Sequence, residues 1–374
     1  MFKSAKKQLN MLARQLKLSI PHNNESPITD QDKETLSVIR AETEKLNQNN
    51  VTRTQAYFDF FQKHNEIHWA LLAHLVSRNA GWNMTDLKGE YLPMLLNQTE
   101  QNNFFCFLER GNWLIFQDAY PQLLLYEKSK ETSQPLFYLL SELKVSSFMR
   151  PFWENFWLHR NSLELTFALI INEQQYIEKR VIQNKLYKET VLDTILFKLQ
   201  DLFDFNLILF PYTTPLQKKT KVVGGTVHHF SSLEDRINLG KGLYNLLFSV
   251  KTRLAQTIDW ADMNPHTGSR KDFWPHLFND VKETAPGSMH EIHNSPCSLQ
   301  VKSLRIYSPS LTLVWKDWVH EKAEAGDWYK NKKAHNWIKK HDKELNGDIQ
   351  ETYCHMIEQL EMAAYTKHLL FNKN

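Results

Sequence analysis

The segment that most constrains the fold of this chain is residues 66–79, which read EIHWALLAHLVSRN. A helix drawn through it carries apolar side chains on nearly every face, so it needs burial on all sides. We therefore expect this helix at the centre of a larger helical body. Gly81 is placed to end it as a left-handed C-terminal residue. Asn83 and Asp86, three positions apart, then resemble the cap of a short following helix.

The rest of the chain also indicates helices. Only 11 of the 374 residues are glycine, well below the usual ~7%, so tight turns and hairpins should be few. Helical periodicity continues from residue 94 to 210, with a break expected at Gly111, and strand-like alternation is absent there. We predict an all-α protein, a multi-helix globular body that is either undivided or split into two helical subdomains.

Composition suggests how the chain is divided. Residues 1–30 form a basic amphipathic segment and a linker, and residues 31–210 a helical subdomain. Residues 211–232 contain Pro, Thr, Gly and Lys and are predicted to be a linker loop. Residues 233–374 form a second helical subdomain that includes a polar loop at 259–296. The amphipathic segment has two interpretations, a helix docked on its own protein or one bound to an anionic surface.

Charge and cysteine content bear on partners and compartment. The net charge of +3 does not demand a nucleic-acid partner. Binding of nucleic acid to a local basic patch is still a hypothesis, because basic residues alternate with Trp near the C-terminus. These residues are Lys330, Lys332, Lys333, Lys339 and Lys340. No apolar run approaches the ~18 residues of a membrane span, and no signal-peptide core is present. Cys106, Cys297 and Cys354 are few and widely spaced, which predicts reduced thiols and a cytoplasmic location.

The first polar cluster follows the apolar helix and contains Arg78, Asn79, Trp82, Asn83 and Asp86. An arginine beside amide donors at a helix end can bind a carboxylate or a phosphate. The same residues can also be explained as a helix stop, a cap and a buried ion pair. Capping accounts for Asn83 and Asp86 but leaves Arg78 and Trp82 unexplained.

The second polar cluster is HTGSRKDFWPH, residues 266–276. A Gly-Ser turn followed by two cations can present N–H groups and positive charge to an anion. The alternative is a capped turn followed by a helix start. The ligand-binding candidates in this cluster are Ser269, Arg270, Lys271 and Trp274. If the protein is an enzyme, the acid/base candidates are His266, Asp272 and His276.

A metal site has weaker support. His64 and His68 stand four positions apart and could face one metal ion. No third or fourth ligand is defined by the spacing, so we expect neither a metal nor another cofactor.

Three stretches carry a family resemblance. They are EIHWALLAHLVSRNAGWNMTDLKG at 66–89, KVVGGTVHHFSSLEDRINLGKGLYNLLF at 221–248 and HTGSRKDFWPHLF at 266–278. They resemble the YppC-like family, a group found chiefly in Bacillus-type Gram-positive bacteria, over about residues 40–345. The resemblance implies a bacterial cytoplasmic protein and assigns no catalytic residues.

These observations lead to two functional hypotheses. The first is a non-catalytic cytoplasmic binding protein, whose anion-accepting cleft is formed by Arg78–Asp86 and His266–His276 and takes a small anionic ligand or a protein partner. The alternative is a hydrolase or transferase acting on a phosphorylated or nucleic-acid substrate. The first hypothesis requires the two clusters to lie within roughly 20 Å of each other, a small-domain dimension.

Overall fold

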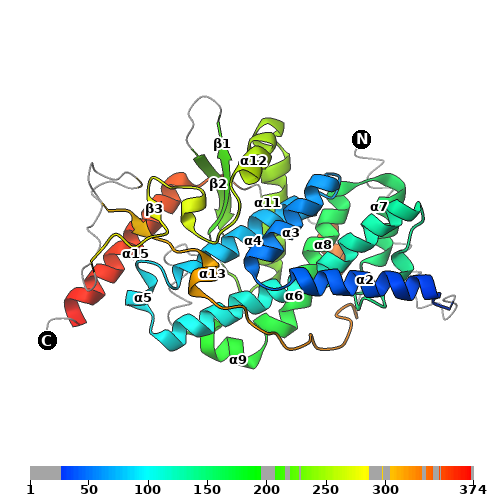
Figure 1. Ribbon diagram of the computed structural model, residues 1–374, viewed down its shortest axis with the longest axis horizontal. Helices are drawn as coiled ribbons and strands as arrows, with labels where there is room; N and C mark the ends of the chain where they lie inside the picture. The colour runs from blue at the N-terminus through cyan, green and yellow to red at the C-terminus, as the bar shows by residue number, and fades with distance from the viewer. Residues whose placement is uncertain are drawn as a thin grey trace.

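The computed structural model describes residues 27–194, 207–214, 220–226, 229–285, 297, 304–330, 334–339, 345 and 347–371 (Figure 1). Helices dominate its first half. In chain order they are α2 (Asp30–Leu46), α3 (Asn50–Lys63), α4 (His68–Asp86), α5 (Leu92–Leu95), α6 (Gln98–Thr132), η1 (Phe137–Leu140), α7 (Arg150–His159), α8 (Ser162–Ile177), η2 (Glu178–Ile182), α9 (Lys185–Tyr187) and η3 (Lys188–Leu192).

The second half mixes short strands with helices. The order is β1 (Leu207–Thr213), β2 (Thr220–Thr226), α11 (Leu233–Phe248), α12 (Lys251–Met263), η4 (Arg270–Asp272), β3 (Phe278–Asn279), β4 (Ile306–Tyr307), α13 (Leu311–Val314), α14 (His335–Lys339), β5 (Gly347–Asp348) and α15 (Gln350–Phe371). The prediction of a predominantly helical protein is confirmed, but the all-α prediction is wrong in detail because two small sheets are present.

Helix α4 lies at the centre of the fold, with α3, α6, α8, α11 and β1 around it (Figure 1). Trp69, Leu75 and Trp82 are buried along it, as an all-round apolar helix requires. The larger of two hydrophobic clusters draws residues from Leu36 to Ala364, and the second includes Met84 at the end of α4 and Phe104 of α6. The division into two helical subdomains stays a prediction.

Helix α4 does not end at Gly81 as the sequence suggested. It continues to Asp86, and Asn83 lies inside it and caps no new helix. A Cβ on Gly81 would stand 2.3 Å from Asn50 Oδ1 and 2.4 Å from His266 Nε2. This glycine is therefore required for the close approach of two side chains. The break expected at Gly111 is also absent, because α6 runs through it.

Capping residues set several helix starts. The Thr29 side chain accepts from Asp32 N at the start of α2, and Ser232 accepts from Asp235 N at the start of α11. At α3 the cap is Asn49, and Thr52 bonds back to it from three positions on. Such reciprocal bonds satisfy N–H groups that a helix leaves unpaired.

The predicted linker loop at 211–232 contains β2 and the end of β1. These strands form an antiparallel hairpin in register Leu207↔Thr226, and β5 adds to β2, giving the order β1-β2-β5. Pro211 and Gly224 hid the strand pattern from sequence reasoning. Proline is tolerated because β1 is an edge strand. Glycine is needed because a Cβ at 224 would lie 1.7 Å from Ile208 O.

The segment after α13 has no regular secondary structure through residue 330. Figure 1 shows it running past α6 as irregular chain. Arginine side chains from the helices hold its carbonyl groups: Arg110 donates to Glu321 O at 2.7 Å and Arg180 to Glu324 O at 2.9 Å. These bonds replace the backbone pairing that a helix would supply.

A disulfide joins Cys297 to Cys354 on α15, with 5.4 Å between their Cα atoms. The prediction of three reduced thiols is therefore wrong for this pair, and Cys106 is the free cysteine. The two bonded residues are 57 positions apart, so spacing gave no sign of their contact. Since disulfides persist mainly in oxidising compartments, the cytoplasmic location stays a prediction. Across the described residues, every helix is too short or too polar to cross a membrane.

Candidate functional site

The two polar clusters predicted from the sequence lie in direct contact. The guanidinium of Arg270 bonds the Asp86 carboxylate through Nε at 2.8 Å and Nη2 at 2.6 Å. Nη2 also donates to Asn83 Oδ1 at 3.1 Å, and Nη1 to Tyr353 Oη at 2.9 Å. Burial alone would lower the pKa of Arg270, but Asp86 and Tyr353 hold it above its usual value. Arg270, which the sequence suggested as an anion-binding residue, is thus already bound by groups of the protein itself.

Arg78 is buried on the other side of this junction. Its Nη2 donates to Asn264 O at 2.5 Å, and its Nε to His74 Nε2 at 2.9 Å. His74 Nδ1 in turn donates to Thr54 O at 2.8 Å, so this ring is neutral, and burial lowers its pKa well below the usual value. Burial also lowers the pKa of Arg78 to about 10. Arg78 Nη1 and Trp82 Nε1 are buried without a hydrogen bond.

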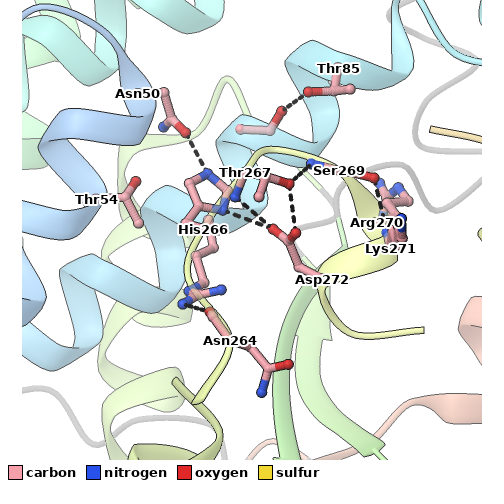
Figure 2. Close-up of polar contacts among 12 residues, drawn as sticks. Asn50, Thr54, Thr85, Asn264, His266, Thr267, Ser269, Arg270, Lys271 and Asp272 are labelled. Carbon is pink, nitrogen blue, oxygen red and sulfur yellow. Dashed lines mark hydrogen bonds and ion pairs between the residues drawn. The ribbon is translucent and has the colours of Figure 1, made fainter. Parts of the chain in front are cut away.

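His266 connects the second cluster to α3 (Figure 2). Its Nε2 donates to Asn50 Oδ1 at 2.9 Å, and its Nδ1 lies 3.5 Å from Asp272 Oδ2. Burial lowers the pKa of His266, an effect that Asp272 partly offsets. Burial alone would raise the pKa of Asp272, but bonds from His266 and Thr267 hold it below its usual value. Both side chains are enclosed, which suits a structural connection better than contact with a substrate.

The other predicted residues have separate contacts. The Asn79 amide binds both backbone groups of Leu209, at 2.8 and 2.9 Å, and so pairs the free edge of β1. Ser269 accepts from Lys271 N and donates to a backbone carbonyl, and Lys271 pairs with Asp280. The remaining two are Trp274, whose Nε1 donates to Thr220 O, and His276, which is exposed.

The paired histidines do not converge on a metal. His64 lies 3.3 Å from Glu127, whereas His68 stacks on Phe248 and bonds Tyr244. Within the described ranges no group of three or more metal-binding side chains occurs. Of the five lysines proposed for nucleic acid, Lys330 is exposed. The side chains of the other four lie outside the described residues.

A cavity of about 510 Å³ lies beside α4. Its wall comes from α3, α4, α5, α6, α8, α11, β1 and α15, and half of the residues that line it are Leu, Ile or Phe. Val76 is 36% exposed although it sits in the middle of the central helix, because its side chain faces this space. Lys367, which is exposed on α15, also lines the cavity, so the cavity opens towards solvent near that helix. Among the predicted site residues, Asn83 and Asp86 line it.

The cavity is long. Both Trp69 near the start of α4 and Asp86 at its end belong to the wall. These residues are separated by about 26 Å at ~1.5 Å per helical residue. The shape therefore suits an extended molecule better than a compact one.

Glu173 of α8 places a carboxyl group at the Trp69 end of the cavity. Its Oε2 accepts from Trp69 Nε1 at 3.1 Å, and its Oε1 accepts from Gln174 at 3.3 Å. Burial, together with the charge of Asp118, raises the pKa of Glu173 to about 8. This acid is consequently largely protonated at neutral pH.

The arginines in or behind the wall are each paired with an acid, whereas Lys367 at the opening donates to Leu95 O. Arg53 bonds Glu109 at 2.5 Å, and both side chains are almost fully buried. Arg236 pairs with Glu178, and Arg270 behind Asn83 pairs with Asp86. Glu173 differs from these acids, since the described part of the chain holds no cation within ion-pair distance of it.

Comparison with known proteins identifies the family. A model described as "Protein of unknown function (DUF2515)" matches residues 45–358. The chain belongs to this family. It is also 40% identical over 331 residues to "Uncharacterized protein YppC" of Bacillus subtilis (strain 168), covering 82% of this chain and 96% of that protein. The resemblance seen in the three sequence stretches is thereby confirmed. No solved structure matches the chain.

The matched region includes both polar clusters and Glu173, while Ala363 and Lys367 at the cavity opening lie beyond it. Sequence reasoning missed Glu173, Tyr353 and the cavity itself. One signal was available, because Glu173 is an acid next to the apolar stretch of α8, SLELTFALIIN. An acid beside an apolar helical stretch indicates a functional or paired group, since ionised groups are rarely buried unpaired.

Proposed function

We propose that this protein is a non-catalytic binding protein whose ligand is an elongated, mostly apolar small molecule. The observation that carries the proposal is the cavity of about 510 Å³ beside α4. Ligand pockets commonly measure ~300–1,000 Å³ and combine an apolar wall with a few placed polar groups. Here the polar groups include Asn83 and Asp86 towards one end and Glu173 with Gln174 towards the other.

The size of the cavity argues against a simple packing fault. Residual cavity volume costs roughly 24 cal/mol per Å³. If it were closed and dry, a void of 510 Å³ would thus forgo on the order of 10 kcal/mol, comparable with the whole stability of a domain, whereas the opening near α15 lets solvent or a ligand fill the space. Because apolar cavities of this kind bind apolar molecules readily, occupancy by a ligand removes that cost.

The proposal is tested by narrowing the cavity. In Val76→Trp a large ring would enter the cavity from the middle of α4, whereas Val38→Trp makes the same substitution at a site that is 63% exposed on α2. N-phenyl-1-naphthylamine, a neutral apolar dye, serves as the fluorescent probe. Wild type and Val38→Trp should bind it alike, and Val76→Trp should lose binding while staying folded by circular dichroism.

A second proposal is that an anion binds where the two polar clusters meet. It is supported by Arg78 Nη1 and Trp82 Nε1, which are buried and make no hydrogen bond. If this site binds an anion, inorganic phosphate at constant ionic strength should raise the melting temperature to a saturating value. A rise that never saturates, or none, would count against it. The contacts of His266 with Asn50 and Asp272 lie outside the cavity wall, and we base no catalytic proposal on them.

A further inference from the structure

The chemistry at the inner end of the cavity indicates what kind of ligand head group it accepts. Glu173 faces a mainly apolar space, and its neighbours Trp69 and Gln174 supply neutral N–H donors only. Buried acids are normally paired with a cation, because an isolated charge is costly in an apolar setting. Burial keeps this acid protonated, and a positive group entering the cavity would stabilise its ionised form.

The neighbouring charges do not fill that role. Arg53 and Arg236 also line the cavity, but they are held by Glu109 and Glu178. Arg236 reaches Glu173 only indirectly, since its Nε donates to Gln174 Oε1 at 2.9 Å. The charge of Asp118 adds to the negative potential at Glu173. No cation of the described residues therefore compensates Glu173 at this end of the cavity.

Aromatic rings complete the setting. Tyr57 and Trp69 both line the cavity, and their ring centroids are 5.4 Å apart with planes at 89°. Aromatic faces attract ammonium groups through the ring quadrupole, most strongly where water is excluded. An acid beside two rings of different orientation is a suitable environment for an amine.

Resting on the proposed function, we infer that the ligand is an elongated apolar amine whose ammonium group pairs with Glu173 beside Tyr57 and Trp69. The alkyl part of such a ligand extends along α4 towards Asp86. Binding at neutral pH releases the carboxyl proton of Glu173 to water, so an ion pair forms and no other bond changes. Charge-assisted hydrogen bonds contribute ~1.5–3 kcal/mol, which corresponds to about a 10- to 100-fold gain in affinity.

The test compares three probes with the same chain, namely dodecylamine, dodecanol and dodecanoate, each below its micellar concentration. Their affinities are measured by displacement of N-phenyl-1-naphthylamine from the wild type and from Glu173→Gln. The amine should bind the wild type at least about 10-fold more tightly than the alcohol. Glu173→Gln should abolish this preference while still binding the alcohol, because glutamine keeps the shape but not the charge.

The outcomes separate the two proposals. If no probe binds, the proposed function fails. If the probes bind but the amine has no advantage, or dodecanoate binds most tightly, the head-group inference is overturned and the apolar site remains. A preference for the amine that persists in Glu173→Gln would also overturn it, since the positive group would then be recognised elsewhere.

Discussion

Replacing Asp86 with alanine is expected to lower the free energy of unfolding by about 3 kcal/mol. The carboxylate accepts two bonds from the Arg270 guanidinium, at Nε and Nη2, in the junction of the two polar clusters. Without it a buried cation keeps only neutral partners, Asn83 and Tyr353. Removing one member of a buried pair costs more than the pair contributes, because the remaining charge stays desolvated.

The measurement is equilibrium unfolding in urea, with Asp30→Ala as the matched control. Asp30 also forms an ion pair, with Lys33, but its side chain is 98% exposed. Exposed pairs contribute at most about 1 kcal/mol, so this variant should stay close to the wild type. Equal losses in the two variants would show that the Asp86 pair has no special structural role. A double variant, Asp86→Ala with Arg270→Met, should recover much of the loss.

Replacing Gly81 with alanine is expected to destabilise the protein by about 2–4 kcal/mol, the combined cost of overpacking and a lost buried hydrogen bond. In an ordinary helix interior the same change stabilises by about 0.5–1 kcal/mol. The sign reverses here because the new methyl group would overlap Asn50 Oδ1 and His266 Nε2, at 2.3 and 2.4 Å. Their mutual hydrogen bond at 2.9 Å joins α3 to the second cluster.

Gly111→Ala provides the control for this prediction. Gly111 also lies inside a long helix, α6, and a Cβ there would meet nothing within 4 Å. Thermal unfolding followed by circular dichroism should show opposite shifts, downward for Gly81→Ala and upward for Gly111→Ala. Stabilisation by both substitutions would mean that the contact at Gly81 is looser than the geometry indicates.

The sequence predicted the parts of the fold that depend on local pattern. The apolar side chains of residues 66–79 predicted that α4 lies at the centre, which the structure confirms. It did not predict features that depend on distant partners. Gly81 reads as a helix stop when its neighbours in space, Asn50 and His266, are unknown. The bond between Cys297 and Cys354 was hidden for the same reason.

The candidate site shows a similar division. The sequence singled out the two polar clusters, and these do meet, at Asp86 and Arg270. Their contact satisfies most of the charge that had suggested an anion site. The cavity could not be predicted, because it is a space left between eight elements and no residue pattern encodes it. Glu173 becomes informative only once its lack of a cation is seen in three dimensions.

The central claim is that the cavity beside α4 is a ligand site. Its most direct test is the dissociation constant of N-phenyl-1-naphthylamine for the wild type, Val76→Trp and Val38→Trp, measured side by side. The claim predicts saturable binding with one site per chain for the wild type and Val38→Trp, and affinity at least about 10-fold weaker for Val76→Trp. Equal affinity in all three proteins, or no saturable binding to the wild type, would contradict it.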